Sequence, residues 1–353
     1  MKKLVLALSA ACLALAAIFA IPEILSGGGG GARSAGPVPS ALVLSTRPGE
    51  KATAPGENAS PGGNSVTAPG VPEVDYTIDL NTGVMTPLPE AIVRSLAKLG
   101  DSGVYPSTSR YAASPDGSRL AYVGIGDEGS LQIFTAGIDG TGVRQMTQDP
   151  KGAMFPAWSP DGTKIVYEGS GGLFVLDVAT GGSTPTNDES PIQPSNQWFS
   201  PQSAPQFTPD GSSLVYTGRN KGRLVLRTVP VAGGKSTILV GPGEGVNDAG
   251  NGSLSPDGSL VTFLGSGKPK EGPGHCGPCR FVANADGSDR RVIPGWLSNV
   301  SGTWSPDGRR IVTSDDGGKG ILVVDIATGD GSYVAKGNGA IWLDRHTLLV
   351  EVV

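Results

Sequence analysis

The residues of this sequence best suited to reactive chemistry are the two cysteines of the segment His275-Cys276-Gly277-Pro278-Cys279. Thiols at this spacing form redox-active pairs when a helix N-terminus lowers their pKa. No helix signal follows the pair, and a zinc site would need two further ligands, whereas the only other histidine is His346. In an oxidising compartment the spacing favours a structural disulfide between Cys276 and Cys279. A redox-active pair, free thiols and an adventitious metal remain the alternatives.

The N-terminus indicates such a compartment. Two lysines precede an uncharged, mostly apolar run at residues 4–21, which is typical of a signal peptide and also just long enough to anchor in a bilayer. Residues 1–25 are therefore predicted to be a cleaved signal peptide or an uncleaved membrane anchor, with the rest of the chain outside the cytoplasm. Lipidation at Cys12 is the weaker alternative, because the residues before it depart from the usual pattern. Residues 26–73 are rich in Gly, Ser and Pro and predict a disordered stalk.

One turn motif recurs along the remainder of the chain, at intervals of about 45 to 50 residues. Its sequence is Ser/Thr-Pro-Asp-Gly, in which Pro presets a type I turn and Gly takes the left-handed conformation that closes a hairpin with a bulge. A short apolar strand follows each copy, so each copy marks a β-hairpin. The residues predicted to form these structural turns are Asp116, Gly117, Asp161, Gly162, Asp210, Gly211, Asp257, Gly258, Asp307 and Gly308.

A second repeated signature is an apolar strand that ends in a Gly-containing turn. Residues 173–181 match residues 321–329 nearly position by position. Four strands in roughly 40–50 residues is the period of a propeller blade. A sixth blade can be assembled from both ends of the chain, because residues 342–350 have the pattern of the first hairpin and residues 76–83 that of the third strand and its turn. The sequence thus predicts an all-β, six-bladed propeller of four-stranded antiparallel blades over residues 74–353, closed by pairing of N-terminal with C-terminal strands.

Apolar residues at helical spacing predict one short helix near 89–99, packing over one mouth of the ring. These repeats resemble those of TolB-type propellers, which are WD-repeat-like. The resemblance implies the six-bladed fold and is nearly silent about function, since the motif lies in structural turns. TolB proteins carry an N-terminal α/β domain, and this chain has the predicted stalk in its place, so the TolB role is not carried over. The hydrolase module of prolyl-oligopeptidase-like peptidases is also missing, because no Gly-x-Ser-x-Gly elbow is present.

Several classes of function are disfavoured. The formal charge of −5 is spread along the chain without a basic cluster, which argues against nucleic-acid binding. Pairs of acidic loop residues lack calcium-binding spacing. We expect no cofactor and no metal, and the two histidines of the chain are too few for the converging groups of a propeller enzyme.

The sequence therefore predicts a non-enzymatic, monomeric, extracytoplasmic binding or scaffold propeller. Its partner is expected to be a protein or glycan of the cell envelope, with membrane attachment if the N-terminal segment is uncleaved. Long connections between the second and third strands of a blade, and between blades, are expected on one face, with Trp198 and Phe199 as candidate partner-binding residues. The alternatives are a lactonase-, lyase- or quinoprotein-like enzyme with a site in the central channel, and the ectodomain of a membrane-anchored sensor. Small, hydroxyl-bearing or apolar residues facing the channel would favour a scaffold.

Overall fold

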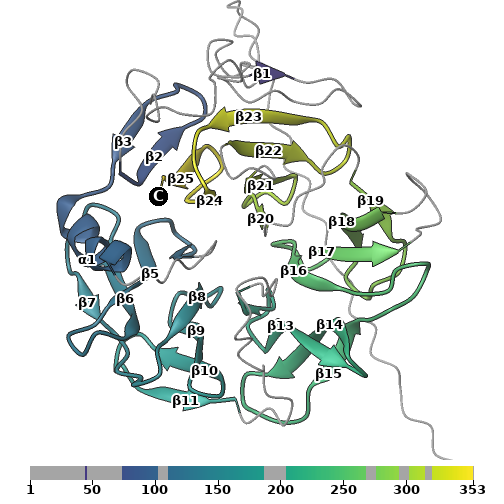
Figure 1. Ribbon diagram of the computed structural model, residues 1–353, viewed down its shortest axis with the longest axis horizontal. Coiled ribbons are helices and arrows are strands. Elements are labelled where there is room, and N and C mark those ends of the chain that lie inside the picture. The colour runs from purple at the N-terminus through teal and green to yellow at the C-terminus, as the bar shows by residue number, and fades with distance from the viewer. Residues whose placement is uncertain are drawn as a thin grey trace, which may run out of the picture. The chain divides into compact units, whose positions relative to one another are not determined.

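The computed structural model shows a ring of six β-sheets (Figure 1). It describes residues 74–101, 110–186, 204–267, 276–293, 302–314 and 320–352, with a two-residue strand at 44–45, and gives the backbone alone at 44–45, 97–101 and 276–278. Each sheet is one blade, whose strands A to D run from the centre of the ring to its rim. The predicted six-bladed, antiparallel fold is confirmed.

The strands of each blade, in the order A to D, have the following bounds. Blade 1 consists of β4 (Tyr111–Ala113), β5 (Arg119–Ile125), β6 (Leu131–Gly137) and β7 (Arg144–Gln145). Blade 2 consists of β8 (Met154–Trp158), β9 (Lys164–Gly169), β10 (Gly172–Asp177) and β11 (Ser183–Pro185). Blade 3 consists of β12 (Gln206–Phe207), β13 (Ser213–Asn220), β14 (Arg223–Pro230) and β15 (Thr237–Val240).

The remaining three blades complete the ring. Blade 4 consists of β16 (Gly250–Leu254), β17 (Leu260–Gly267), β18 (Cys276–Asn284) and β19 (Arg291–Val292). Blade 5 consists of β20 (Thr303–Trp304), β21 (Arg310–Ser314), β22 (Ile321–Asp325) and β23 (Gly331–Ala335). Blade 6 consists of β24 (Gly339–Trp342), β25 (Thr347–Glu351), β2 (Tyr76–Asp79) and β3 (Met85–Pro87).

Blade 6 closes the ring with strands from both ends of the propeller. Strand β2 pairs antiparallel with β25, so that Tyr76 lies opposite Val350 and Asp79 opposite Thr347. This backbone pairing protects two sheet edges that would otherwise be exposed. The predicted closure is confirmed.

The five repeated A–B turns share one hydrogen-bond pattern. In the first copy the Ser114 hydroxyl donates to Asp116 Oδ1 at 2.5 Å and accepts from the Arg119 amide at 3.0 Å. Gly117 has a φ of 70°, and the glycines of the other four copies have φ values between 69° and 71°. A side chain is disfavoured in this left-handed region, which explains the glycine in every copy. Blade 6 uses a different turn, in which Asp344 accepts the His346 and Thr347 amides.

The predicted helix is present as α1 (Glu90–Asp101), but its predicted position over a mouth of the ring is wrong. The helix lies at the rim, between blades 6 and 1 (Figure 1). Ile92 and Leu96 are buried in one cluster with Tyr122 of blade 1 and Leu349 of blade 6. An amphipathic face specifies that an apolar surface is covered, but not which one.

Residues 1–73 are described at one place only. Strand β1 (Leu44–Ser45), which falls in the predicted stalk, pairs with the outer strand β23 of blade 5. The predicted signal or anchor segment at 4–21, and Cys12 within it, lie outside the described residues. Within the described part of the chain, no helix has the length and apolar character needed to cross a membrane.

Candidate functional site

The innermost strands of the six blades enclose a cavity of about 350 Å³ along the axis of the ring. Because side chains alternate along a strand, residues two apart on an A strand face the same side. Each A strand contributes a central residue to the lining of the cavity, and these six residues are Ala112, Ala157, Gln206, Ser253, Thr303 and Ile341. Among the described residues that line the cavity, none carries a charge, and all six of these are small, hydroxyl-bearing, amide or apolar. Such a wall can accept hydrogen bonds and apolar contacts.

Tryptophans on three A strands fix the backbone of this wall. The indole of Trp158 donates to the Ala112 carbonyl of the preceding blade at 3.1 Å. Trp304 and Trp342 donate in the same way to the carbonyls of Ser253 at 2.9 Å and Thr303 at 3.1 Å. Each acceptor belongs to one of the six central residues. The channel is therefore held by bonds that cross from blade to blade, which suits a rigid binding surface.

The polar groups of the channel lie mainly on blades 3 and 4. The Gln206 amide nitrogen donates to the Ser253 hydroxyl at 3.0 Å. Asn251 lies in the bulge of β16 with a φ of 50°, and its backbone amide donates to the Thr217 hydroxyl. The side-chain oxygen of Asn251 is buried and has no hydrogen-bond partner in the described part of the chain.

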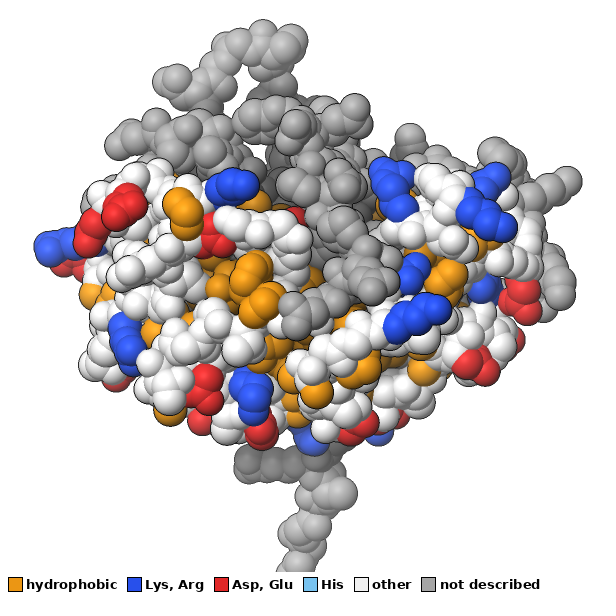
Figure 2. Space-filling view, turned by 90° about the horizontal axis from the view of Figure 1, so that it is seen from below, with side chains coloured by type: hydrophobic (Ala, Val, Ile, Leu, Met, Phe, Trp, Pro, Cys, Tyr) orange, Lys and Arg blue, Asp and Glu red, His pale blue; other side chains and the backbone are white. Residues whose placement is uncertain are grey.

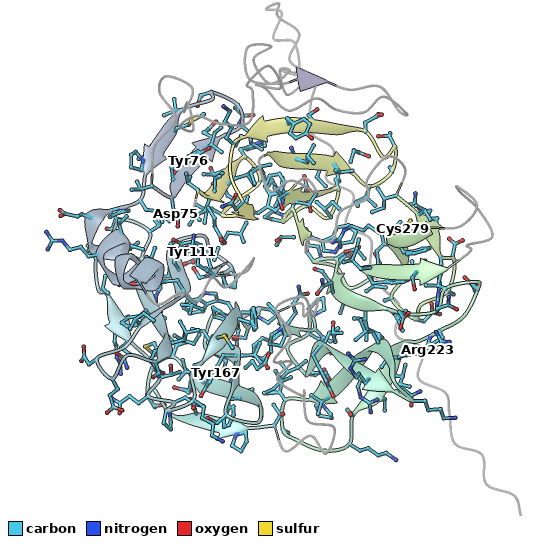
Figure 3. All side chains as sticks on the ribbon, viewed as in Figure 1. Asp75, Tyr76, Tyr111, Tyr167, Arg223 and Cys279 are labelled. Atoms are coloured by element: carbon cyan, nitrogen blue, oxygen red, sulfur yellow. The ribbon has the colours of Figure 1, made fainter. Side chains whose placement is uncertain are left out.

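A buried ionic cluster joins blade 6 to blade 1. The Arg110 guanidinium donates to Asp75 Oδ2 at 3.2 Å and to Glu351 Oε2 at 3.3 Å. The Tyr111 hydroxyl also donates to Asp75 Oδ2, and the Val352 amide donates to Asp75 Oδ1 at 2.8 Å. Figure 3 shows Asp75 and Tyr111 beside one another at this boundary. The cluster thus connects the N-terminal strands, the C-terminal strand and the first A strand of blade 1.

Burial and charge shift the pKa of each group in this cluster in a definite direction. Burial raises the pKa of Glu351 to about 7, although the Arg110 guanidinium opposes the shift. Burial also raises the pKa of Tyr111 well above its usual value, and the Asp75 carboxylate adds to the effect. For Arg110 burial acts to lower the pKa, but Glu351 and Asp75 outweigh it and the pKa is raised. Arg110 therefore stays charged, and the cluster is a structural lock.

A second buried carboxyl, Glu168, occupies the matching strand position in blade 2. Glu168 follows Tyr167, which is paired with Phe174 of strand C, just as Glu351 follows Val350, which is paired with Tyr76 of strand C. Burial alone raises the pKa of Glu168 to about 7. Sequence reasoning missed both glutamates, although the alignment of the repeats would have placed them at the same position of strand B.

The two faces of the ring differ in their connections. The face with the A–B and C–D turns, which we call the turn face, is closed by short turns whose aspartates are engaged locally. The loop face carries the B–C and D–A connections. Three of its B–C connections are tight turns (126–130, 170–171 and 221–222), contrary to the prediction that all are long and irregular. Gly171 and Gly222, with φ of 95° and 83°, permit the two shortest. The long connections are those at 186–205, 241–249, 268–275 and 293–302.

The aspartates of the repeated Ser/Thr-Pro-Asp-Gly motif accept hydrogen bonds from residues of their own turns. The Ser114 hydroxyl and the Ser118 amide and hydroxyl donate to Asp116, and these bonds lower the pKa of Asp116 to about 2. Asp161 and Asp210 have the same arrangement and the same lowered pKa of about 2. A carboxylate held in this way is a poor general base.

The other predicted site residues are only partly described. Cys279 is fully buried and disulfide-bonded, while the side chain of Cys276 lies outside the described residues. Trp198 and Phe199 also lie outside them. Within the described ranges no three His, Cys, Asp or Glu side chains gather as metal ligands. On the rim shown in Figure 2, cationic and anionic side chains are interspersed.

Comparison with known proteins gives a consistent picture of the fold. Residues 104–272, which span blades 1 to 3 and half of blade 4, match the family described as PD40, TolB beta propeller domain. No curated protein matches the sequence.

Solved propellers resemble the chain at low identity. TolB from Acinetobacter baumannii is 17% identical with a TM-score of 0.51, over 65% of this chain and 54% of that one, so the chain spans about half the length of that protein. Putative TolB from Agrobacterium tumefaciens is 21% identical (TM-score 0.44, 57% and 71% covered). An oligogalacturonate lyase in complex with manganese is 18% identical (TM-score 0.42, 64% of each chain). Sequence identities this low indicate a similar fold and carry no information about function. The family match over residues 104–272 and the six-bladed ring together show that the chain contains a β-propeller similar to those of TolB.

Proposed function

We propose that this propeller is a non-enzymatic binding scaffold outside the cytoplasm, which engages a protein or glycan of the cell envelope through its loop face. The observation that carries the proposal is the difference between the two faces. Short turns with internally satisfied aspartates close the turn face, whereas the long connections at 186–205, 241–249 and 268–275 all belong to the loop face. Binding residues are commonly carried by loops on a rigid scaffold.

The composition of the channel supports binding. Its described wall presents the Gln206–Ser253 pair, the Thr303 hydroxyl and apolar residues such as Ala157 and Ile341. A cavity of about 350 Å³ lies in the range of ligand pockets, at its small end. A loop or sugar that enters from the loop face would meet hydrogen-bonding groups held on a backbone that the tryptophan bonds keep in place.

Site-specific photo-crosslinking on intact cells tests this proposal. A photoreactive residue is placed at Glu128 or Asn247 on the loop face, and in matched variants at Ala179 or Lys235 on the turn face. All four positions are exposed and belong to connections between strands. The full chain is used in its native envelope, and adducts are identified by mass spectrometry. We expect reproducible adducts from the loop-face positions and few from the turn-face positions. Equal labelling from both faces, or labelling from the turn face alone, would contradict the proposal.

A further inference from the structure

Two equivalent grooves lie at the rim of the ring, one between blades 6 and 1 and one between blades 1 and 2. Among the described elements, a helix occupies only the first. Blade 1 presents the stacked pair Tyr122 and Phe134, with ring centroids 5.7 Å apart, on the side that faces blade 6. Blade 2 presents the matching pair Tyr167 and Phe174, 5.5 Å apart, on the side that faces blade 1. In both blades the two aromatic residues are directly paired across strands B and C.

Helix α1 fills the first of these grooves. The Ser95 hydroxyl lies 3.0 Å from the Tyr122 hydroxyl. Ile92 is fully buried in the hydrophobic cluster that contains Tyr122, and Phe134 packs against the same cluster. At the other end of the groove Pro89 covers Gly140 in the C–D turn so closely that a Cβ there would lie 2.5 Å from the proline. The helix therefore extends from the C–D turn of blade 1 to the end of its strand B.

The groove between blades 1 and 2, which we call the blade 1–2 groove, holds no helix. The shorter connection 146–153 takes its place and sends Met146 and Ala153 into the core. The outer part of the groove stays open as a cavity of about 740 Å³, which reaches from Lys151 to the C–D turn at Gly181. Gly181 corresponds to Gly140, but a Cβ at Gly181 would meet only the tip of Arg144, at 3.3 Å.

More cationic than anionic side chains line this groove. Arg144 and Lys151 line the cavity, are exposed, and form no ion pair within the described residues. Asp149, the carboxylate beside them, accepts the amide of Ser170 at 2.8 Å and the amide of Lys151 at 2.9 Å, and it also interacts electrostatically with the Lys151 ammonium. With Arg144 and Lys151 against Asp149, the described lining keeps an excess of one positive charge on a chain whose formal charge is −5. Carboxylates on a partner would be attracted to this lining.

We propose that the blade 1–2 groove binds a short amphipathic helix of a partner protein, one that carries carboxylates beside its apolar stripe. The internal precedent is α1, whose apolar residues Ile92 and Leu96 pack against the equivalent groove together with Leu88, which precedes the helix. Residues at this spacing form one face of a helix, which is the usual way that a helix enters a groove. This surface lies at the rim, apart from the channel and from the long connections at 186–205, 241–249, 268–275 and 293–302, so the proposal goes beyond the binding function proposed above.

A designed peptide tests this inference directly. The probe is a fluorescent peptide with the sequence of residues 88–101, in which Arg94 and Lys98 are replaced by Glu, titrated with the full chain and followed by anisotropy. We expect saturable binding with a Kd on the order of 10–100 µM, and at least about fivefold weaker binding of the unaltered peptide, in which the charges of Arg94 and Lys98 are balanced by those of Glu90 and Asp101. The double variant Arg144→Glu/Lys151→Glu should weaken binding of the acidic peptide by about tenfold or more.

Two further variants make the outcome decisive. Ser183 lines the groove from the exposed strand β11, so Ser183→Trp should fill the cavity and abolish binding without disturbing the core. The matched control Lys235→Glu/Arg309→Glu makes the same change in charge at exposed positions outside the groove and should leave the Kd unchanged. Absence of saturable binding up to about 1 mM peptide would overturn the proposal. Binding that ignores both groove variants would overturn it as well. Either failure leaves the crosslinking result on the loop face unaffected.

Discussion

Blades 6 and 2 carry a buried glutamate at the same place, and their surroundings differ. Glu351 ends strand B of blade 6 and meets Arg110, which also holds Asp75. Glu168 lies one residue before the end of strand B of blade 2 and has no ion pair within the described residues. In blade 2 a two-residue turn connects strands B and C, whereas in blade 6 those strands come from opposite ends of the propeller.

In blade 2 a covalent turn holds strands B and C together, and in blade 6 the ionic cluster has that role. Bringing the two ends of a long chain together costs entropy, which a tight turn avoids. In blade 6 the cluster of Asp75, Arg110 and Glu351 holds together segments that no turn joins. In blade 2 the glutamate contributes no such link, and its burial only penalises the charged carboxylate.

The largest expected effect comes from Arg110→Met. The substitution leaves Asp75 and Glu351 buried without their cation, which should lower the free energy of unfolding by about 3–5 kcal/mol. Denaturant unfolding of the full chain, followed by tryptophan fluorescence, measures the loss. The matched control is Arg119→Met, since Arg119 is partly exposed and stacks on Trp158 with its guanidinium carbon 5.1 Å from the ring centroid. Its loss should be about 1 kcal/mol or less. Equal losses for the two variants would show that the cluster does not lock the ring.

A smaller effect, of opposite sign, is expected from Glu168→Gln. Because the folded state raises the pKa of Glu168 from 4.5 to about 7, its contribution to stability is full below pH 4.5 and is lost as the pH rises to about 7. The amide cannot ionise, so the variant should be more stable than the parent at pH 8 by about 2–3 kcal/mol, with the difference shrinking toward pH 4.5.

Unfolding measured at a series of pH values between 4 and 8 checks this prediction. The matched variant Glu351→Gln should not show the gain, since it also weakens the bond to Arg110. A pH-independent difference for Glu168→Gln would mean that its carboxyl is not desolvated in the folded state.

The smallest effect should be common to both blades. Trp342→Phe in blade 6 and Trp158→Phe in blade 2 each remove one indole bond to a carbonyl of the preceding blade. Each should lower the free energy of unfolding by about 1 kcal/mol, because one hydrogen bond between neighbouring blades is lost. Phe207 occupies this position naturally in blade 3, so the ring tolerates the change. Thermal unfolding of the two variants side by side is the measurement. A much larger loss for Trp342→Phe would show that the closing blade depends on this bond more than a continuous blade does.

The features predicted correctly from the sequence are those with local causes. The turn at Ser114 to Gly117 is specified by its own four residues, and its repetition fixes the number of blades and the closure of the ring. The existence of α1 follows from the spacing of Ile92 and Leu96. The place of α1 could not be predicted, because several apolar surfaces on the ring could have covered the same helix face.

The ionic cluster and the blade 1–2 groove depend on contacts between distant segments. Asp75, Arg110 and Glu351 are three isolated charges in the sequence. The pairing of β2 with β25 brings the two carboxylates together, and the packing of blade 1 against blade 6 adds Arg110. Likewise Arg144 and Phe174 line one cavity only because two neighbouring blades pack side by side.

The sequence by itself determined the six-bladed fold and its closure, because turn chemistry and strand periodicity act over a few residues and repeat. The tertiary structure alone decided which buried glutamate is paired with a cation, and which groove holds the helix of the chain and which is open. Those outcomes depend on packing across blades, where the partners come from segments that the repeat pattern treats as equivalent.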